Sequence, residues 1–330
     1  DCLTGTFSLV GCDDITVWGI TFDCVAAPWI QGTVTSVDKS YFGFTLEVDK
    51  GYTIYDDERV EKMYAELGSS KAITGNVYVE TGRLKSSAND YFTATSYEKI
   101  GETTYLVTTN RSFLTPEFID VGDRIVLNTR WGGGSVFELL HSKGDITIRE
   151  CTVYAHVGCG IMATYGTGAL TVDNFNILRK PGTDRMISTN ADGIHVQGLL
   201  GPATITNCTF EGMMDDGINF YQYPIAISSV NSGTNIVLYH AQYTVTAGET
   251  LYFYNAETGT YKGCANVLSS EKTAGGDEIT LDTQIEGLTA GTFPTGDCVY
   301  TSGLAFENSV IENNTFREYR GAGIICRANN

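Results

Sequence analysis

Two short segments of the sequence are close copies of each other, and both carry acidic residues. Asn190-Ala191-Asp192-Gly193-Ile194-His195 is matched by Met214-Asp215-Asp216-Gly217-Ile218-Asn219, which places Asp216 24 residues after its equivalent, Asp192. Asp215 adds a third acid. Crowded carboxylates repel one another when ionised, and such groups cluster at sites that perform acid–base chemistry. Asp192, Asp215 and Asp216 are therefore candidate catalytic residues.

The length of this repeat fits one coil of a parallel β-helix, in which each coil stacks on the one before it. Stacking would bring Asp192 and Asp216 to about one strand spacing, ~4.8 Å. Asp-Gly is also a common turn pair, and acids of this kind can cap turns or bind calcium. We favour catalysis because two such pairs stand in register and a further acid lies beside them.

Alternating apolar residues, rich in β-branched types, predict one strand region in each of five coils. These segments are 15–23, 146–154, 170–178, 203–212 and 306–317, and in their alignment Val17, Ile148, Val172, Ile205 and Ile311 coincide. Three residues later the position is apolar in most coils, holds Cys151 and Cys208, and in the last coil holds Asn314. We expect the cysteines to be core residues and the asparagine to form a hydrogen-bonded ladder.

A second strand is entered by Gly-Ile in four coils, at 158–161, 191–194, 215–218 and 321–324. Glycine suits a position that needs a positive φ or a close approach of another backbone. By alternation, His195 and Asn219 point outward on the side of Asp215. In the first coil the same spacing begins a second strand at Trp29, which aligns Gln31 with His195 and Asn219.

The repeat is interrupted twice by inserts that we predict to be small β-barrels or sandwiches. The expected organisation is a first β-helix coil (1–30), a barrel (31–130), catalytic coils (131–222), a second barrel (223–301) and a continuation of the β-helix (302–330). The inserts resemble one another at 121–127 and 247–253, and at 33–38 with 42–48 against 225–230 with 235–239. Residues 58–67 have helical spacing.

Composition narrows the class of partner. The formal net charge of −18 disfavours nucleic acid and anionic membranes. No window holds eighteen apolar residues, so we expect no membrane span. No signal peptide opens the sequence, and we expect a processed or trimmed chain with incomplete β-helix caps. The nine cysteines lack metal-binding spacing. We expect buried thiols, while a Cys2–Cys12 disulfide remains an alternative.

The two acidic motifs, within 188–195 and 210–219, closely resemble glycoside hydrolase family 110. Further matches lie at 20–23, 31–34, 136–139 and 320–321, although this chain reads Asp-Asp-Gly-Ile-Asn where the family usually reads Asp-Asp-Ala-Ile-Asn. The family comprises α-1,3-galactosidases, including enzymes that act on blood-group B antigens. The resemblance implies an all-β, right-handed parallel β-helix with β-barrel insertions, and inverting hydrolysis of a galactose-terminated glycan.

Glycoside hydrolysis needs one carboxylic acid to protonate the leaving oxygen and a carboxylate that activates water or attacks directly. Taken as an acid–nucleophile pair, Asp192 and Asp216 at one strand spacing would favour retention. Inversion, which the resemblance implies, is compatible with this spacing if Asp192 and Asp216 together hold the water and act as the base while Asp215 acts as the acid. Its anionic neighbours should raise the pKa of Asp215, as that role requires.

Candidate ligands for sugar hydroxyls are His195 and Asn219, with Gln31 in the same column and Arg320 in the last coil. Arg185 lies on a loop of about nine extra residues within 179–190, which is expected to overhang the mouth of the site. An ordinary surface histidine or solvated arginine is the simpler alternative for these residues. Trp29, Trp131 or Tyr221 would supply an aromatic face, although core packing is the default for each.

Two other enzyme classes and one binding class compete with this interpretation. A polygalacturonase should carry Gly-His-Gly and Arg-Ile-Lys motifs, and neither occurs here. A polysaccharide lyase would need calcium or a basic residue in the acidic column. A non-catalytic carbohydrate-binding β-helix would not need crowded acids. We expect no cofactor and no metal, and a secreted, periplasmic or cell-surface location inferred from the substrate class; the sequence is silent on oligomeric state.

Overall fold

The chain is an all-β protein in the computed structural model, which describes residues 7–40, 42–52, 73–88, 91–109, 117–129, 134–239, 241 and 243–327. Within these ranges the only helix is the single 3-10 turn η3 (Ser302–Leu304). No helix of this part is long and apolar enough to cross a membrane. The predicted helix at 58–67 lies outside the described residues.

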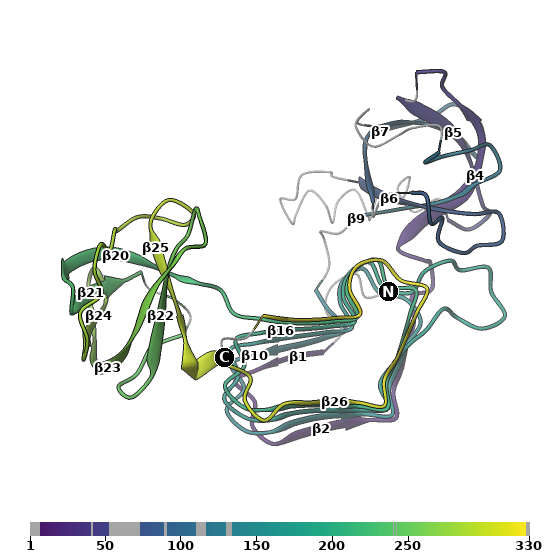
Figure 1. Cartoon of the computed structure of the whole chain (residues 1–330). Coiled ribbons are helices and arrows are strands. Elements are labelled where there is room, and N and C mark those ends of the chain that lie inside the picture. The colour runs from purple at the N-terminus through teal and green to yellow at the C-terminus, as the bar shows by residue number, and fades with distance from the viewer. Residues whose placement is uncertain are drawn as a thin grey trace.

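Three parallel sheets form the sides of a coiled stack, the arrangement of a parallel β-helix (Figure 1). Sheet A contains β1 (Phe7–Val10), β10 (Phe137–Leu140), β13 (Ile161–Thr164), β16 (Ile194–Gln197), β19 (Ile218–Tyr221) and β28 (Ile324–Arg327). Sheet B contains β2 (Ile15–Trp18), β11 (Ile146–Arg149), β14 (Leu170–Asp173), β17 (Ala203–Thr206) and β26 (Val310–Glu312). Sheet C contains β3 (Thr21–Phe22), β12 (Thr152–Val153), β15 (Asn176–Ile177), β18 (Thr209–Glu211) and β27 (Thr315–Arg317).

The strand register confirms the sequence alignment of the coils. In sheet B, Val17, Ile148, Val172, Ile205 and Ile311 are successive partners. In sheet A, the isoleucines that follow the Gly-Ile glycines pair in the same way. Except for the exposed Ile324, these side chains belong to one continuous apolar core or pack against it. Alternation drives this arrangement, because every second side chain of a strand faces the same side.

The side chain of Asn314 bonds the backbone of the coil before it and not a stacked asparagine, because Cys208 holds the equivalent position there; the expected asparagine ladder is therefore wrong at this position. Asn314 Oδ1 accepts the N–H of Cys208 at 2.8 Å, and its Nδ2 donates to the carbonyl of Ile205 at 2.9 Å. Cys151 and Cys208 are buried in the core, as expected. All eight cysteines in the described part are free thiols, but Cys264 and Cys326 are exposed, so the expectation of burial is wrong for these two. Cys2 lies outside the described residues.

Both inserts are closed six-stranded antiparallel barrels. The first contains β4 (Trp29–Val37), β5 (Gly43–Val48), β6 (Ile73–Tyr78), β7 (Phe92–Lys99), β8 (Thr104–Thr109) and β9 (Arg124–Thr129). The second contains β20 (Ile225–Ser232), β21 (Asn235–Leu238), β22 (Thr250–Asn255), β23 (Tyr261–Thr273), β24 (Gly276–Leu281) and β25 (Asp297–Thr301). Around each wall the order is first, second, fifth, fourth, third and sixth strand of that barrel. The inserts are therefore copies of one topology.

One of the two predicted likenesses between the inserts is wrong. The hairpins β4–β5 and β20–β21 are equivalent, as the sequence indicated. Residues 121–127, however, lead into β9, the sixth strand of its barrel, whereas 247–253 lead into β22, the third strand. A glycine followed by an acid occurs at the start of several strands; for the sixth strand of the second barrel, β25, this pair is Gly296-Asp297.

The first coil also differs from the prediction. Its strand in sheet A is β1, which precedes β2 and pairs with β10. Trp29 to Gln31 instead pair with β9 and belong to the first barrel. The same apolar alternation serves a barrel strand and a β-helix strand, so spacing from Val17 alone did not separate them.

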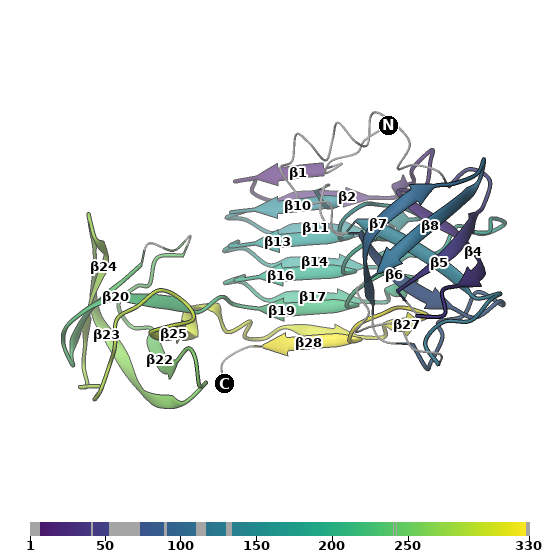
Figure 2. The same cartoon turned by 90° about the horizontal axis from the view of Figure 1, so that it is seen from above.

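Sheet A lies between the two barrels (Figure 2). The first barrel packs on the turns before sheet A, where Met186, Ile187 and Met214 join its apolar core. The Tyr78 hydroxyl of β6 reaches the sulfur of Met214 at 3.4 Å. The start of β19, and with it Asp215, therefore lies beside the first barrel.

Candidate active site

Asp192 and Asp216 occupy the same position in neighbouring coils, just before β16 and β19. The N–H of Gly193 donates to the carbonyl of Asp216 at 2.9 Å, and that of Gly217 donates to the carbonyl of Ala322 at 2.9 Å. Cys159 holds this position one coil earlier, because the N–H of Gly160 donates to the carbonyl of Asp192. Stacked backbone therefore sets the spacing of the acids.

The glycine that follows each aspartate is required by close approach. A Cβ on Gly193 would lie 2.5 Å from the carbonyl oxygen of Gly217 and 2.6 Å from the ring of Phe210. A Cβ on Gly217 would lie 2.5 Å from the carbonyl oxygen of Gly323 and 2.6 Å from the ring of Phe316. Neither glycine has a positive φ. Of the two reasons that the sequence offered, backbone approach is the operative one.

The three predicted acids come together. One carboxylate oxygen from each of Asp192, Asp215 and Asp216 lies within 4.8 Å of the other two. Asp192 and Asp216 are buried, whereas Asp215 is half-buried. The cluster stands at the edge where sheet A begins.

Each of the two buried aspartates is held in the same way. Asp192 accepts the N–H of Asp216 through Oδ1 at 3.3 Å, and Asp216 accepts the N–H of Ala322 through Oδ1 at 2.6 Å. The second oxygen meets the side chain three residues later: Nδ1 of His195 lies 2.5 Å from Asp192 Oδ2, and Nδ2 of Asn219 donates to Asp216 Oδ2 at 3.2 Å. An ionised carboxylate accepts all of these contacts.

His195 links the acids to a line of tyrosines on the outer face of sheet A. Its Nε2 lies 2.9 Å from the hydroxyl of Tyr221. That hydroxyl also contacts Gln197 at 3.2 Å and Tyr223 at 3.3 Å, and Gln197 donates to Tyr165 at 3.1 Å. Burial and then the hydrogen bond to Tyr223 raise the pKa of Tyr221, so its hydroxyl stays protonated.

Tyr319, in the turn before the last coil, also borders the acids. Its pKa is raised by burial and then by the negative charge of Asp216. Of these residues only Tyr221 was a candidate from the sequence; Tyr165, Gln197 and Tyr319 were not predicted. Gln197 is detectable by alternation, because it lies two residues after His195 and shares its face. Tyr319 precedes a turn, where parity gives no signal.

Two groups of side chains near the acids could hold a metal ion. One is the trio of aspartates, and the other is Cys159 with Asp192 and His195; in each, the ligand atoms lie within 4.8 Å of one another. Oxygen ligands alone suit calcium or magnesium, whereas the mixed set suits zinc. Calcium binding by the aspartates was the alternative to catalysis at the level of sequence, whereas the group with Cys159 was not predicted, because Cys159 was interpreted as a core thiol.

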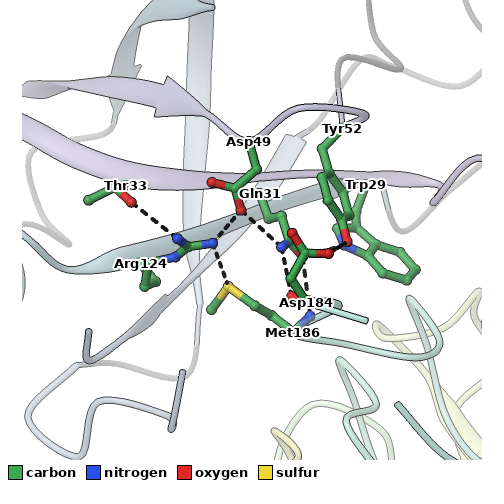
Figure 3. A network of polar contacts seen from close by, with 8 residues as sticks. All are labelled: Trp29, Gln31, Thr33, Asp49, Tyr52, Arg124, Asp184 and Met186. Carbon is green, nitrogen blue, oxygen red and sulfur yellow. Dashed lines mark hydrogen bonds and ion pairs between the residues drawn. The ribbon is translucent and has the colours of Figure 1, made fainter. Parts of the chain in front are cut away.

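Gln31 does not stand beside His195 and Asn219, so its predicted place in their column is wrong. It lies in β4 of the first barrel, fully buried, and its amide contacts Asp49, Asp184, Met186 and Trp29 (Figure 3). Trp29 is likewise buried, as the default of core packing expected. Trp131 lies outside the described residues.

The two predicted arginine ligands occupy different surroundings. Arg185 forms a salt bridge with Asp23 and donates to the carbonyl of Cys24 at 3.0 Å, so its guanidinium fastens the loop to the end of sheet C. Arg320 lies in the turn next to the acids. Its N–H donates to the carbonyl of Met213. The following residue, Gly321, is so close to the acids that a Cβ built on it would lie 2.5 Å from Asp216 Oδ1. Of the two, only Arg320 is shown next to the acidic turn.

The chain is similar to bacterial proteins named alpha-1,3-galactosidase A or B. No family model matches the chain. It is 22% identical over 226 residues to alpha-1,3-galactosidase A from Shewanella woodyi, covering 66% of this chain and 35% of that protein. It is 23% identical over 232 residues to alpha-1,3-galactosidase B from Bacteroides thetaiotaomicron, covering 70% and 37%. Over 85 residues, or 26% of this chain and 14% of the relative, it is 32% identical to alpha-1,3-galactosidase A from Bacteroides fragilis.

The chain thus spans little more than a third of the length of the Shewanella woodyi and Bacteroides thetaiotaomicron relatives. An all-β chain with three parallel sheets, two barrels and a cluster of three acids is similar to galactosidases of several bacteria. The relationship is distant, and it supports a glycosidase as the class.

Proposed function

We propose that the protein is an exo-acting glycoside hydrolase that removes terminal α-1,3-linked galactose from glycans. The observation that carries the proposal is the convergence of Asp192, Asp215 and Asp216 within 4.8 Å at one edge of the β-helix. Distant relatives bearing the name alpha-1,3-galactosidase support the choice of sugar and linkage. Glycans of this kind lie outside the cytoplasm, which is the basis for proposing a secreted, periplasmic or cell-surface location.

In this proposal Asp192 and Asp216 activate the attacking water and Asp215 protonates the leaving oxygen. The two buried aspartates already accept hydrogen bonds from Asp216 N–H, Ala322 N–H, His195 and Asn219, which suits groups that work as carboxylates. Asp215 is the more accessible of the three and so is better placed to meet a leaving group. His195 and Asn219 orient the two bases. Both ring nitrogens of His195 are engaged by Asp192 and Tyr221, so of the two residues Asn219 is the proposed ligand of a sugar hydroxyl.

The stereochemical outcome depends on how the acid and base are spaced. Inverting enzymes hold their carboxyl groups about 6.5–9.5 Å apart, and retaining enzymes about 5 Å apart. The closest oxygens of the three acids fall within 4.8 Å. Contact between single oxygens does not fix the separation of whole carboxyl groups, so the anomer of the released galactose decides between the two outcomes.

The test is a proton NMR time course with an unactivated α-1,3-galactosyl disaccharide. Release of β-galactose as the first product is the expected result for inversion; α-galactose would assign direct attack by one aspartate instead. Asp192→Asn should remove the activity, while Asp173→Asn on sheet B, a matched change away from the acids, should leave it intact. Binding of the disaccharide without any release of galactose would overturn the proposal in favour of a carbohydrate-binding protein.

A further inference from the structure

Gln31 is an amide whose hydrogen-bonding capacity is used in full where no solvent reaches it. Its Nε2 donates to Asp49 Oδ2 at 3.0 Å and to the carbonyl of Asp184 at 2.9 Å. Its Oε1 accepts the N–H of Met186 and the indole N–H of Trp29, each at 3.2 Å. These four hydrogen bonds fix the orientation of the amide and join β4 to the loop that contains Asp184 and Met186.

A second layer of contacts holds Gln31 in place. The N–H of Asp49 donates to the backbone carbonyl of Gln31 at 2.9 Å, and the carboxylate of Asp49 forms a salt bridge with Arg124. Arg124 also donates to Thr33 at 3.2 Å and lies 3.8 Å from the sulfur of Met186. Figure 3 shows Gln31 between Asp49 on the barrel side and Asp184 on the loop side.

Tyr52 adds a second clamp on the same loop. Its hydroxyl donates to Asp184 Oδ1 at 2.6 Å. Burial and then this hydrogen bond raise the pKa of Tyr52, so the hydroxyl remains a donor throughout the neutral range. The barrel thus grips Asp184 by its backbone carbonyl and by its carboxylate.

The gripped loop leads directly to the acids. We call residues 184–192 the acid segment, because Asp192 ends it. The residue before the first barrel strand contacts this segment a second time near its end, where the side-chain amide of Asn190 donates to the carbonyl of Pro28 at 3.1 Å. Between the two grips, the N–H of Met214 donates to the carbonyl of Thr189 at 3.0 Å. Residues 28–31 are therefore hydrogen-bonded to the acid segment near both of its ends, at Asp184 and at Asn190.

We infer that Gln31 is a positioning residue for Asp192, which it acts on by anchoring the acid segment to the first barrel. The consequence for catalysis rests on the proposed function; the anchoring itself does not. On this inference the barrel is part of the catalytic scaffold, since it sets the backbone from which one of the buried aspartates projects.

A neutral amide is needed at this position. A carboxylate of the same shape has no hydrogen to donate to the carbonyl of Asp184, and it would bring a second negative charge against Asp49. Gln31→Glu is therefore a nearly isosteric change that breaks the contact with the loop at Asp184 and also the contact with Asp49. Tyr52→Phe removes only the contact with the Asp184 carboxylate, and so it provides a milder variant if Gln31→Glu fails to fold.

The matched control is Thr74→Val in the same barrel. The Thr74 hydroxyl donates to Asn128 Oδ1 at 2.8 Å, so this isosteric change also removes one buried hydrogen bond of the first barrel. Each variant is purified and compared with the wild type by melting temperature, by steady-state hydrolysis of the disaccharide, and by hydrogen–deuterium exchange of peptides that cover the acid segment.

We expect Gln31→Glu to lower kcat by about tenfold or more with little change in KM, since small displacements of a catalytic group are costly. Tyr52→Phe should show a smaller loss of kcat. Both variants should speed hydrogen–deuterium exchange in the acid segment at temperatures where the protein is folded. Thr74→Val should change neither kcat nor this exchange rate, apart from any effect through its melting temperature.

Unchanged exchange of the acid segment in a folded Gln31→Glu or Tyr52→Phe variant would overturn the inference, whatever happens to the activity. A loss of kcat equal to that of Thr74→Val would reduce Gln31 to a residue of barrel stability, and would also overturn it. A wild-type protein that releases no galactose would instead sink the proposed function, while the exchange measurement would still decide whether Gln31 anchors the acid segment.

Discussion

The carboxylate of Asp192 accepts a hydrogen bond from the backbone N–H of Asp216, its equivalent in the next coil. Asp216 in turn accepts the N–H of Ala322, one coil further on. In each coil a backbone N–H therefore orients the carboxylate at the equivalent position of the coil before it. The two aspartates share one backbone environment, and they differ in the partner three residues later, which is His195 for Asp192 and Asn219 for Asp216.

Asp192→Asn should lower kcat/KM for the disaccharide by about 10²-fold or more, because general-base assistance contributes on that order. The amide can accept from Asp216 N–H through its oxygen, but its NH2 group then faces His195 and no longer accepts a proton from water. Circular dichroism should remain that of the wild type. Comparable losses in Asp192→Asn and in the sheet B control Asp173→Asn would contradict a catalytic role.

Asp215→Asn should separate substrates by leaving group. An unactivated disaccharide needs a proton on its leaving oxygen, so its hydrolysis should fall by about 10³-fold, within the usual contribution of general acids. A p-nitrophenyl α-galactoside leaves as a stable phenolate, so its hydrolysis should fall by far less. Initial rates on both substrates check this; equal losses on the two would exclude Asp215 as the acid.

Gly217→Ala should destabilise the β-helix by about 1–3 kcal/mol, the usual cost of overpacking. The new methyl group would meet the carbonyl of Gly323 at 2.5 Å and the Phe316 ring at 2.6 Å. Gly275→Ala in the second barrel is the control, since its Cβ would find only Thr273 at 3.9 Å. Urea unfolding of both variants measures the difference; equal midpoints would show that the rungs tolerate a side chain at the glycine.

Asp297 should contribute stability that depends on acid pH. Burial alone would raise the pKa of this fully buried carboxyl, but hydrogen bonds from Lys262 and from the N–H of Thr289, with the charge of Lys262, hold it below the ordinary value. The stabilisation is therefore complete above the unfolded pKa of about 3.9 and is lost as the pH falls through the lower, folded pKa.

Asp297→Asn should accordingly cost about 3 kcal/mol at pH 7, the lower end of the range for breaking a buried ion pair. The difference from the wild type should shrink as the pH falls below about 4. Urea unfolding at pH 7, 5, 4 and 3 provides the measurement. A gap that stays constant over this range would mean that the pair does not lower the pKa.

Much of the fold could be predicted from the sequence, because a β-helix repeats its register in every coil. The column from Val17 to Ile311 and the Gly-Ile entries were read directly from period-two alternation. What failed was the assignment of Trp29 and Gln31 to a coil. A barrel strand shows the same alternation, and only its pairing with β9 distinguishes it.

The site was predictable to the same extent. Asp192, Asp215, Asp216, His195 and Asn219 belong to the repeat, and the structure brings them together. Contacts between a coil and an irregular segment leave no periodic pattern in the sequence. The turn that places Tyr319 near Asp216 and the loop that joins Asp184 to Gln31 depend on the path of irregular segments, which alternation does not describe.

The stacked hydrogen bonds from Gly193 to Asp216 and from Gly217 to Ala322 have a consequence for the divergence of such proteins. The separation of the acids is set by the spacing between hydrogen-bonded strands, which does not depend on the side chains. Interior side chains can therefore drift widely between relatives while the distance between two carboxyl-bearing residues stays the same. Low overall identity between relatives is what such a scaffold would be expected to leave.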